Sequence, residues 1–194
     1  MPKQVDHEHR RRQIADALWR VVVSRGFDGV SLRSVAAEAG VSMGLVQHYF
    51  RTKEQMLSFA MDSIGERVGE RAAAELVGLP DPPPPRAHLR ALLIQMIPLD
   101  EARRQEAHSL FAYFVGGVRD GVIGERMRSG VTLIRAFVAE QIAAGGVEPD
   151  PERATTILLA LSDGLAAHVL GGYLSPAEAV SALDAHLDHL FEQS

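Results

Sequence analysis

The stretch "SLRSVAAEAGVSMGLVQHYF", from Ser31 to Phe50, contains two short helical patterns separated by a single glycine. Ser31 is suited to cap the first helix, because its side-chain oxygen can accept a hydrogen bond from a backbone N–H of the first turn. Gly40 is placed to end that helix, and Ser42 is suited to cap a second one, expected over about residues 42–49. Two helices joined by a tight turn that contains glycine predict a helix-turn-helix.

The helical periodicity of the second helix divides it into two faces. Val41, Val46 and Phe50 fall on one side and are expected to pack against the first helix. The residues that point away are Met43, Gly44, Leu45, Gln47 and His48, and none of them is Lys or Arg. The second helix of a helix-turn-helix enters the major groove of DNA, so these outward side chains would lie at base edges.

The remainder of the chain also favours helices, so the expected fold class is all-α with about nine helices. A first helix is expected over about 8–26, and a capping-box pattern at Thr52–Gln55 opens a helix that runs to about Val77. The segment "LPDPPPPR", Leu79–Arg86, is not expected to be helical, because consecutive prolines favour an extended form. It is interpreted as a rigid connector, with a proline-motif ligand for a partner as the alternative. Further helices are expected at about 86–97, 100–118 and 120–145, from Asp150 to about Gly172, and from Ser175 onward.

The distribution of charge separates the N-terminal residues from the rest. The formal net charge is −5, yet nine basic and five acidic side chains give residues 1–53 a charge of +4 and leave −9 elsewhere. A basic segment on an acidic body is typical of proteins that bind polyanions such as DNA, with chance asymmetry as the alternative. The expected organisation is a helix-turn-helix DNA-binding domain at 1–53, a connecting helix at 54–77, and a ligand-binding and dimerisation domain at 78–194.

The composition and the motif content exclude several classes of protein. The absence of cysteine excludes disulfides and thiolate metal sites and is compatible with a reducing cytoplasm. No signal peptide and no membrane-spanning run is visible, so a cytoplasmic protein without a membrane partner is expected. Hydrolase, P-loop and dinucleotide-binding motifs are absent, so no enzyme, catalytic residue or cofactor is predicted. The cluster Asp184, His186, Asp188 and His189 could bind a metal ion, but is interpreted as surface or interface, so no metal site is predicted.

The segment from Ser31 to Leu57, "SLRSVAAEAGVSMGLVQHYFRTKEQML", resembles the DNA-binding head of the TetR family of transcriptional regulators. The resemblance covers about residues 8–62 and combines the helix caps, the Ala-x-x-Ala-Gly-Val-Ser turn and a Thr-Lys-Glu box. The stretches "GVSMGLVQHYFRTK" and "LALSDGLAAHVL" further resemble the choline/betaine-pathway repressor subgroup. The resemblance implies a ligand-responsive repressor that binds a palindromic double-stranded DNA operator as a homodimer and is released by a small-molecule effector. The alternative is a helical adaptor, or a metal- or small-molecule-binding protein, that does not bind DNA.

The same resemblance assigns the DNA contacts. The implied set is Ser31, Arg33, Ser42, Met43, Gly44, Leu45, Gln47, His48, Tyr49 and Lys53. Arg33 matches a position that contacts a base or a phosphate, and Gly44 one that lets the helix approach the duplex closely. Gln47 replaces the tyrosine that is usual in the family, and its amide can pair with adenine. The positions that match phosphate contacts are His48, Tyr49 and Lys53.

Two of these assignments, and the interpretation of a further basic run, leave an alternative open. Arg33 can be merely solvated, and the ring of Tyr49 can be packed at the helix junction. The Arg10–Arg12 run resembles a basic arm near the minor groove or the DNA backbone, but a solvated start of the first helix fits it equally well.

The body of the chain is expected to dimerise and to bind the effector. The last two helices are the expected interface, because two such helices from each chain make a four-helix bundle. The predicted interface residues are Leu161, Leu165, Val180, Leu183, Leu187 and Leu190, with a face buried within one chain as the alternative. The predicted ligand-binding residues are Met96, His108, Phe111, Phe114, Phe137, His168 and Tyr173, any of which can instead be plain core. The body has no tryptophan for an aromatic cage, so choline is not predicted as the ligand.

Overall fold

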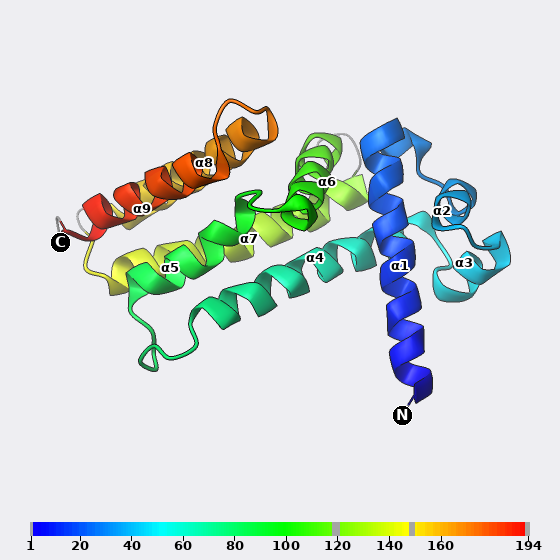
Figure 1. Cartoon of the computed structure of the whole chain (residues 1–194), viewed down its shortest axis with the longest axis horizontal. Helices are drawn as coiled ribbons and strands as arrows, with labels where there is room; N and C mark the ends of the chain where they lie inside the picture. Colours follow the sequence, from blue (N-terminus) through cyan, green and yellow to red (C-terminus); the bar gives the residue numbers. More distant parts are fainter. Residues whose placement is uncertain (1, 118–120, 148–149, 193–194) are drawn as a thin grey trace. The chain divides into compact units, whose positions relative to one another are not determined.

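The computed structural model describes residues 2–117, 121–147 and 150–192. Every regular element in these ranges is a helix, as predicted. Figure 1 labels the α-helices and colours them from blue at the N-terminus to red at the C-terminus. The α-helices are α1 (Pro2–Arg25), α2 (Leu32–Ala39), α3 (Met43–Tyr49), α4 (Lys53–Glu75), α5 (Pro85–Leu93), α6 (Glu101–Gly117), α7 (Gly121–Ala144), α8 (Pro151–Leu170) and α9 (Pro176–Glu192). Two short 3₁₀ helices, η1 (Phe27–Gly29) and η2 (Ile94–Met96), precede α2 and follow α5. The fold class is therefore all-α.

The helices form two compact units. Unit 1 comprises Met1–Glu66 and His108–Met127, and unit 2 comprises Arg67–Ala107 and Arg128–Ser194. Unit 1 contains α1, α2 and α3, while unit 2 contains α5, α8 and α9. The three remaining helices, α4, α6 and α7, contribute residues to both units.

The core of unit 1 is built on the apolar stripe of α1. Ile14, Leu18 and Val21 on this stripe are at most 1% exposed, as the helical periodicity predicts. Trp19 is 6% exposed, and its indole N–H donates a hydrogen bond to the carbonyl oxygen of Ala60 on α4 at 3.4 Å. The indole therefore joins α1 to α4 within this unit, in agreement with a packing role for the side chain.

The core of unit 2 is formed by side chains of α5, α7, α8 and α9. Leu165, Leu183 and Leu187 belong to this core, with exposed fractions of 7, 1 and 0%. The other members of the predicted dimer interface, Leu161, Val180 and Leu190, are partly buried and pack against the same cluster. The side chains of the three core leucines are therefore covered by their own chain, as in the alternative of a face buried within one chain, and the dimer interface stays a prediction. An apolar helical stripe has the same spacing whether it packs within a chain or between chains.

The helix ends follow the predicted capping residues. The side chains of Ser31, Ser42 and Asp150 each accept a hydrogen bond from the backbone N–H three residues further along. Ser175 and Glu178 form a reciprocal capping box at the start of α9. Their side-chain and backbone hydrogen bonds hold the pKa of the Glu178 carboxyl below its usual value. Local hydrogen bonds thus fix where these four helices begin.

Two helix starts differ in detail from the prediction. The side chain of Gln55 accepts a hydrogen bond from the N–H of Arg51 at 2.9 Å, one residue before Thr52, which was the expected partner. Helix α5 begins at Pro85, inside the segment expected to be non-helical, because proline is tolerated in the first turn of a helix.

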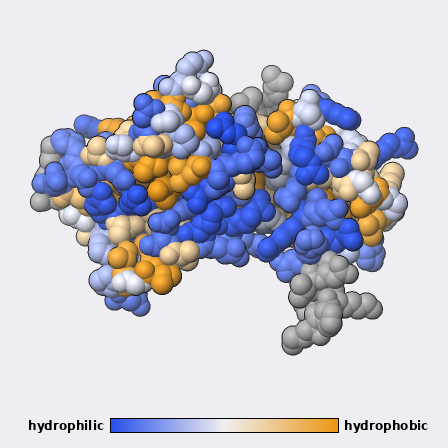
Figure 2. All heavy atoms as spheres, in the orientation of Figure 1, coloured by the Kyte–Doolittle hydropathy of each residue, from blue (hydrophilic) through white to orange (hydrophobic). Residues whose placement is uncertain are grey.

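The remainder of the proline-rich segment joins α4 to α5, as predicted for a connector. Val77, just before the segment, and Leu79 at its start are 83% and 43% exposed, and Figure 2 shows hydrophobic side chains gathered over the loop between α4 and α5. None of the described helices is long and apolar enough to cross a membrane.

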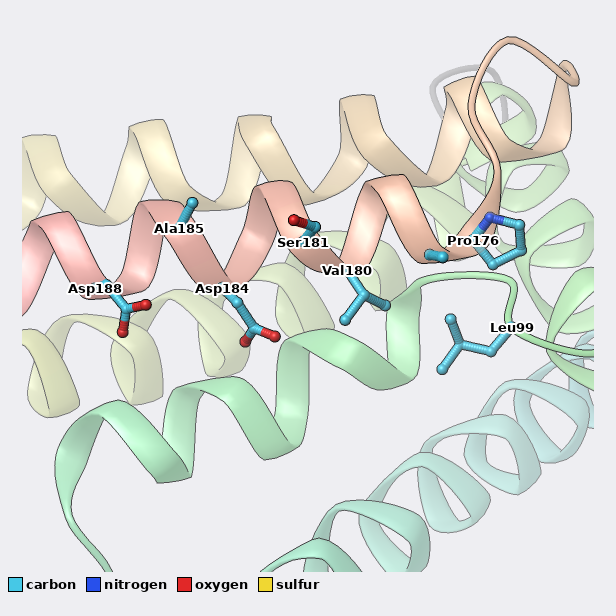
Figure 3. A pocket seen from close by; sticks show the side chains of 8 residues that line it. Leu99, Pro176, Val180, Ser181, Asp184, Ala185 and Asp188 are labelled. Carbon is cyan, nitrogen blue, oxygen red and sulfur yellow. The ribbon is translucent and has the colours of Figure 1, made fainter.

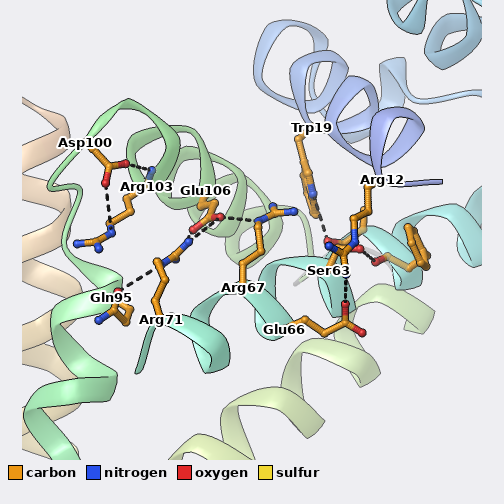
Figure 4. A network of polar contacts seen from close by, with 12 residues as sticks. Arg12, Trp19, Ser63, Glu66, Arg67, Arg71, Gln95, Asp100, Arg103 and Glu106 are labelled. Atoms are coloured by element: carbon orange, nitrogen blue, oxygen red, sulfur yellow. Dashed lines mark hydrogen bonds and ion pairs between the residues drawn. The ribbon is translucent and has the colours of Figure 1, made fainter. Parts of the chain in front are cut away.

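A network of polar side chains joins α4 to α6 within unit 2 (Figure 4). The Nε of Arg67 lies 2.7 Å from one carboxylate oxygen of Glu106, and Arg71 donates to the other oxygen at 2.6 Å. Arg71 also donates to the side-chain oxygen of the buried Gln95 at 3.2 Å. The side chain of Glu106 is 10% exposed, so this carboxylate depends on the two guanidinium groups for the hydrogen bonds that water would otherwise supply.

Replacing Glu106 by alanine is expected to lower the free energy of unfolding by about 3 kcal/mol, because two half-buried guanidinium groups lose their carboxylate. Glu101→Ala, on the same helix, is the matched control, since that side chain is 74% exposed. It is expected to cost less than about 1 kcal/mol. Urea unfolding followed by circular dichroism compares the two variants, and equal losses would contradict a stabilising role for the network.

Candidate nucleic-acid interface

The turn between α2 and α3 is closed by backbone hydrogen bonds. Gly40 has φ 67° and ψ 31°, the left-handed conformation that glycine adopts without strain. The N–H groups of Gly40 and Val41 donate to the carbonyl oxygens of Ala37 and Ala36 at 3.3 and 3.0 Å. The side chain of Ser42 then caps α3. These bonds fix the direction in which α3 leaves α2 and confirm the predicted helix-turn-helix.

Helix α3 buries one face and exposes the other. Val46 and Phe50 are 0% and 1% exposed, whereas Val41 is only partly buried because it lies in the turn, outside both helices. The outward residues are distributed as predicted: Met43, Gly44, Gln47 and His48 are exposed, and Leu45 and Tyr49 are partly exposed. The exposed set carries no Lys or Arg, so α3 offers donors, acceptors and apolar contacts rather than formal charge.

The backbone does not require glycine at position 44. The φ angle of Gly44 lies outside the left-handed region, and a Cβ built there would meet only the Oγ of Ser42, at 4.0 Å. A glycine inside a helix costs about 0.5–1 kcal/mol relative to alanine. Neither conformation nor packing within the chain explains this cost, and a close approach of another molecule to the backbone of α3 at Gly44 stays a prediction.

The two candidate residues at the start of α2 are both exposed. Ser31 caps the helix, and its hydroxyl also lies 3.0 Å from that of Ser34. Arg33 makes no hydrogen bond or ion pair with any described residue, so its guanidinium group is open to a partner outside the chain. The alternative of a merely solvated arginine has the same geometry.

Lys53 has a structural partner of its own. Its Nζ donates a hydrogen bond to the carbonyl oxygen of Phe27 at 2.7 Å, which joins the start of α4 to η1. Substitution of Lys53 would therefore disturb the packing of unit 1 as well as any phosphate contact. It is a poor choice for a test of DNA contact alone.

The Arg10–Arg12 run does not form a free basic arm. Arg10 donates to Gln13 at 2.6 Å, and Arg12 is paired with Glu8 and Glu66 at 2.8 and 3.4 Å. The guanidinium carbon of Arg11 lies 4.0 Å from the ring centre of Phe59 and 5.2 Å from that of Phe50. Neither alternative suggested by the sequence describes Arg11, because helical spacing turns it toward the aromatic side chains of unit 1.

The sequence did not indicate that His7, an exposed residue near the start of α1, belongs to this surface. The first helix was expected to begin near residue 8, but α1 starts at Pro2 and carries His7 on a helical turn. The His7 ring lies 4.5 Å from the ring of Tyr49, centre to centre. No sequence signal could have indicated this pairing, because 42 positions separate the two residues. The contact also shows that the ring of Tyr49 is packed at a helix junction, one of the two alternatives predicted for it.

The predicted ligand-binding residues are divided between the two compact units. Met96 and Phe137 pack against the core of unit 2, and the Phe137 ring lies 5.0 Å from that of His88. The rings of His168 and Tyr173 lie 5.9 Å apart, but Tyr173 is 80% exposed. The other three residues, His108, Phe111 and Phe114, belong to unit 1, and Phe114 is 55% exposed. Four of the seven residues thus belong to unit 2 and three to unit 1, and their role in binding an effector stays a prediction.

Unit 2 contains an open groove of about 640 Å³ along α9 (Figure 3). Its lining residues are Leu99, Pro176, Ala177, Val180, Ser181, Asp184, Ala185 and Asp188. Asp184 is bonded to Arg90 at 2.6 Å and raises the pKa of that guanidinium above its usual value, and Asp188 is paired with Arg86. Both carboxylates of the groove are thus already engaged by α5.

The described residues contain no group of three or more His, Cys, Asp or Glu side chains placed to hold a metal ion. Partial burial, together with the neighbouring His189, lowers the pKa of the His186 imidazole below its usual value.

A helix-turn-helix whose second helix exposes an uncharged face, joined to a second helical unit, defines a DNA-binding regulator. Comparison with known families agrees. Residues 14–58 match the bacterial regulatory proteins of the tetR family, and residues 85–192 match the C-terminal part of BetI-type transcriptional repressors. The chain belongs to the TetR family of transcription regulators, and within it to the repressor type; its relatives are regulators and not enzymes.

Individual relatives support this assignment. The HTH-type transcriptional regulator PksA of Bacillus subtilis (strain 168) is 35% identical, over 88% of this chain and 83% of that protein. The crystal structure of a transcriptional regulator from Rhodococcus sp. Rha1 superposes with a TM-score of 0.78 at 32% identity, covering 94% of this chain and 96% of that one. A regulator from Saccharomonospora viridis in complex with choline has the same fold, with a TM-score of 0.74 at 24% identity over 96% and 97% of the two chains.

Replacing Gly44 by alanine is expected to raise the free energy of unfolding by up to about 1 kcal/mol, because alanine is the better helix former and the space around position 44 is open. DNA affinity is expected to fall at the same time, because the added methyl group stands on the face that approaches the duplex. Gly65→Ala on α4, which also has open space, is the control for the gain in stability alone. A Gly44→Ala variant that binds DNA as tightly as the wild type would show that no close approach occurs at this position.

Proposed function

We propose that the chain is a repressor that binds a two-fold symmetric DNA operator as a homodimer and is released by a small-molecule effector. The observation that carries the proposal is the exposed face of α3 in the helix-turn-helix, on which Gly44 leaves the helix backbone open to a close approach. Around it, Arg33 and Arg51 are exposed and supply positive charge for the DNA backbone.

The direct test is a footprint on the DNA upstream of the gene, repeated at increasing salt concentration. A dimer that contacts several phosphates loses affinity steeply with salt, because binding releases counterions from the DNA. A protected region with two-fold symmetry supports the proposal. An adaptor that does not bind DNA would protect no sequence at any salt concentration.

Gln47 is the residue proposed to read a base. It is exposed on α3, and its amide can donate to and accept from the major-groove edge of adenine. It also stands where the family pattern usually has tyrosine, so operators of relatives are not transferred to this chain.

Replacing Gln47 by alanine is expected to change the preference among operator variants, with a loss of about 1–3 kcal/mol confined to sequences that carry the matching base. The measurement is the dissociation constant for a set of operators, each substituted at one position. His9→Ala, an exposed change on α1, serves as the control for nonspecific loss. An equal loss of affinity for every operator in Gln47→Ala would indicate that the Gln47 side chain contacts the DNA backbone and not a base.

The homodimer is proposed to form through the outer faces of α8 and α9. The exposed residues of α8 include Ile157, Ala160 and Gly164, and those of α9 include Ala182 and Ala185. Ile157 is 51% exposed, and the four small residues allow a partner helix to approach closely. This surface consists of exposed residues of the same two helices that carry the predicted leucines, whose buried members Leu165, Leu183 and Leu187 face the core of unit 2.

Replacing Ala160 by arginine is expected to convert the dimer into a monomer, because a charged side chain would be buried at the centre of the helix contact. DNA affinity should then fall by about 100-fold or more, since each chain binds its half-site alone. The oligomeric state is measured by light scattering, with Ala73→Arg on the exposed side of α4 as the control. A variant that remains a dimer would place the interface elsewhere.

The chemistry of the effector is left open by this proposal. A regulator of the same fold binds choline, but the described aromatic residues of unit 2 do not form the cage that a quaternary ammonium group requires. A thermal-shift screen that includes choline tests this directly. A ligand that raises the melting temperature and also releases the footprint would identify the effector class.

A further inference from the structure

Three aromatic rings meet where the start of α1 contacts the end of α3. The ring centre of His7 lies 4.5 Å from that of Tyr49 and 6.1 Å from that of His48, while His48 and Tyr49 are 5.2 Å apart. Tilted and edge-to-face arrangements at such distances are favourable contacts between rings. They hold two imidazoles side by side, although one comes from α1 and the other from α3.

Both imidazoles are exposed, whereas Tyr49 is partly buried. An imidazole always carries one ring N–H donor, and it carries two when protonated. Such a donor reaches an oxygen acceptor at about 2.8 Å. Two rings whose centres are 6.1 Å apart can therefore donate to oxygens of one phosphate group held between them.

The three arginines that follow His7 most closely on α1 do not compete for this position. Arg10, Arg11 and Arg12 engage Gln13, aromatic rings or glutamates within unit 1. His7 is thus the exposed polar side chain of α1 that the described contacts bring against α3. Its neighbour His48 belongs to the helix proposed to enter the major groove, so the pair lies at the edge of the DNA-contacting surface.

We propose that His7 and His48 together bind one phosphate of the DNA backbone, and that the Tyr49 ring positions both imidazoles. This inference rests on the proposed function, to which it adds α1 as a source of DNA contacts. A backbone contact contributes affinity and register and not the choice of base. Loss of His7 should therefore weaken binding to all operator variants alike.

Simple packing of the rings would give the same contacts in the absence of DNA. His7→Phe separates the two roles, because phenylalanine keeps a ring for Tyr49 but has no N–H donor. His7→Ala removes the ring and the donor together. His9→Phe is the matched control, since His9 is an exposed histidine on the same helix, two residues further along.

The experiment measures the affinity of wild type and variants for the DNA fragment that the footprint defines, together with interference by phosphate ethylation. His7→Phe and His7→Ala are both expected to weaken binding about tenfold or more, the loss typical of a hydrogen bond to a charged group. In the wild type, ethylation of one phosphate per half-site should interfere with binding through this contact. Interference at that phosphate should be weaker in His7→Phe, in which only His48 is left to contact it, while His9→Phe should keep the wild-type pattern.

Two results would overturn the inference while leaving the proposed function intact. His7→Phe could bind like wild type while only His7→Ala is weaker, which would assign His7 to ring packing alone. The ethylation patterns of wild type and His7→Phe could also be identical, which would exclude a phosphate contact by His7. Wild-type protein that protects no DNA would overturn the proposed function itself, and this inference with it.

Discussion

The burial of Phe50 determines what α3 can present to another molecule. Its ring is 1% exposed, lies 5.5 Å from the ring of Phe59, and is covered by the guanidinium group of Arg11. Val46, one turn earlier, is buried on the same face, so two anchors fix the rotation of the helix about its axis. A rotation by one residue, about 100°, would bury Gln47 and expose Val46. The exposed, uncharged face of α3 is therefore a consequence of aromatic packing behind it, and the positive charge must come from neighbouring elements such as α2.

The features that the sequence predicted correctly depend on short-range interactions. Ser31, Gly40 and Ser42 act through hydrogen bonds that span three to five residues, so the pattern of residue types contains all the information needed. The same holds for the capping box at Ser175 and for the division of α3 into two faces. Family membership rested on these local features as well, because caps, turn and aromatic residues recur at fixed spacing.

The features that the sequence could not predict depend on which surfaces meet. The stripe that includes Leu183 and Leu187 is a correct prediction of a buried face, but nothing in its spacing indicates whether the covering side chains belong to the same chain. Arg11 was grouped with its basic neighbours in the sequence. Its side chain, however, leaves α1 in a different direction from theirs and lies over the rings of Phe50 and Phe59. The ligand-binding set stays a prediction for a related reason, since the sequence does not show which side chains meet when residues such as Phe114 and Phe137 belong to different compact units.

The position of Trp19 gives the protein an internal spectroscopic reporter. It is the only tryptophan in the chain, it is 6% exposed, and it lies in unit 1 with its indole N–H bonded to the backbone of α4. Indole fluorescence therefore follows the unit that contains the helix-turn-helix, whereas far-ultraviolet circular dichroism follows the helices of both units. The difference between the two signals can distinguish loss of the helix-turn-helix unit from global unfolding, without any label attached to the protein.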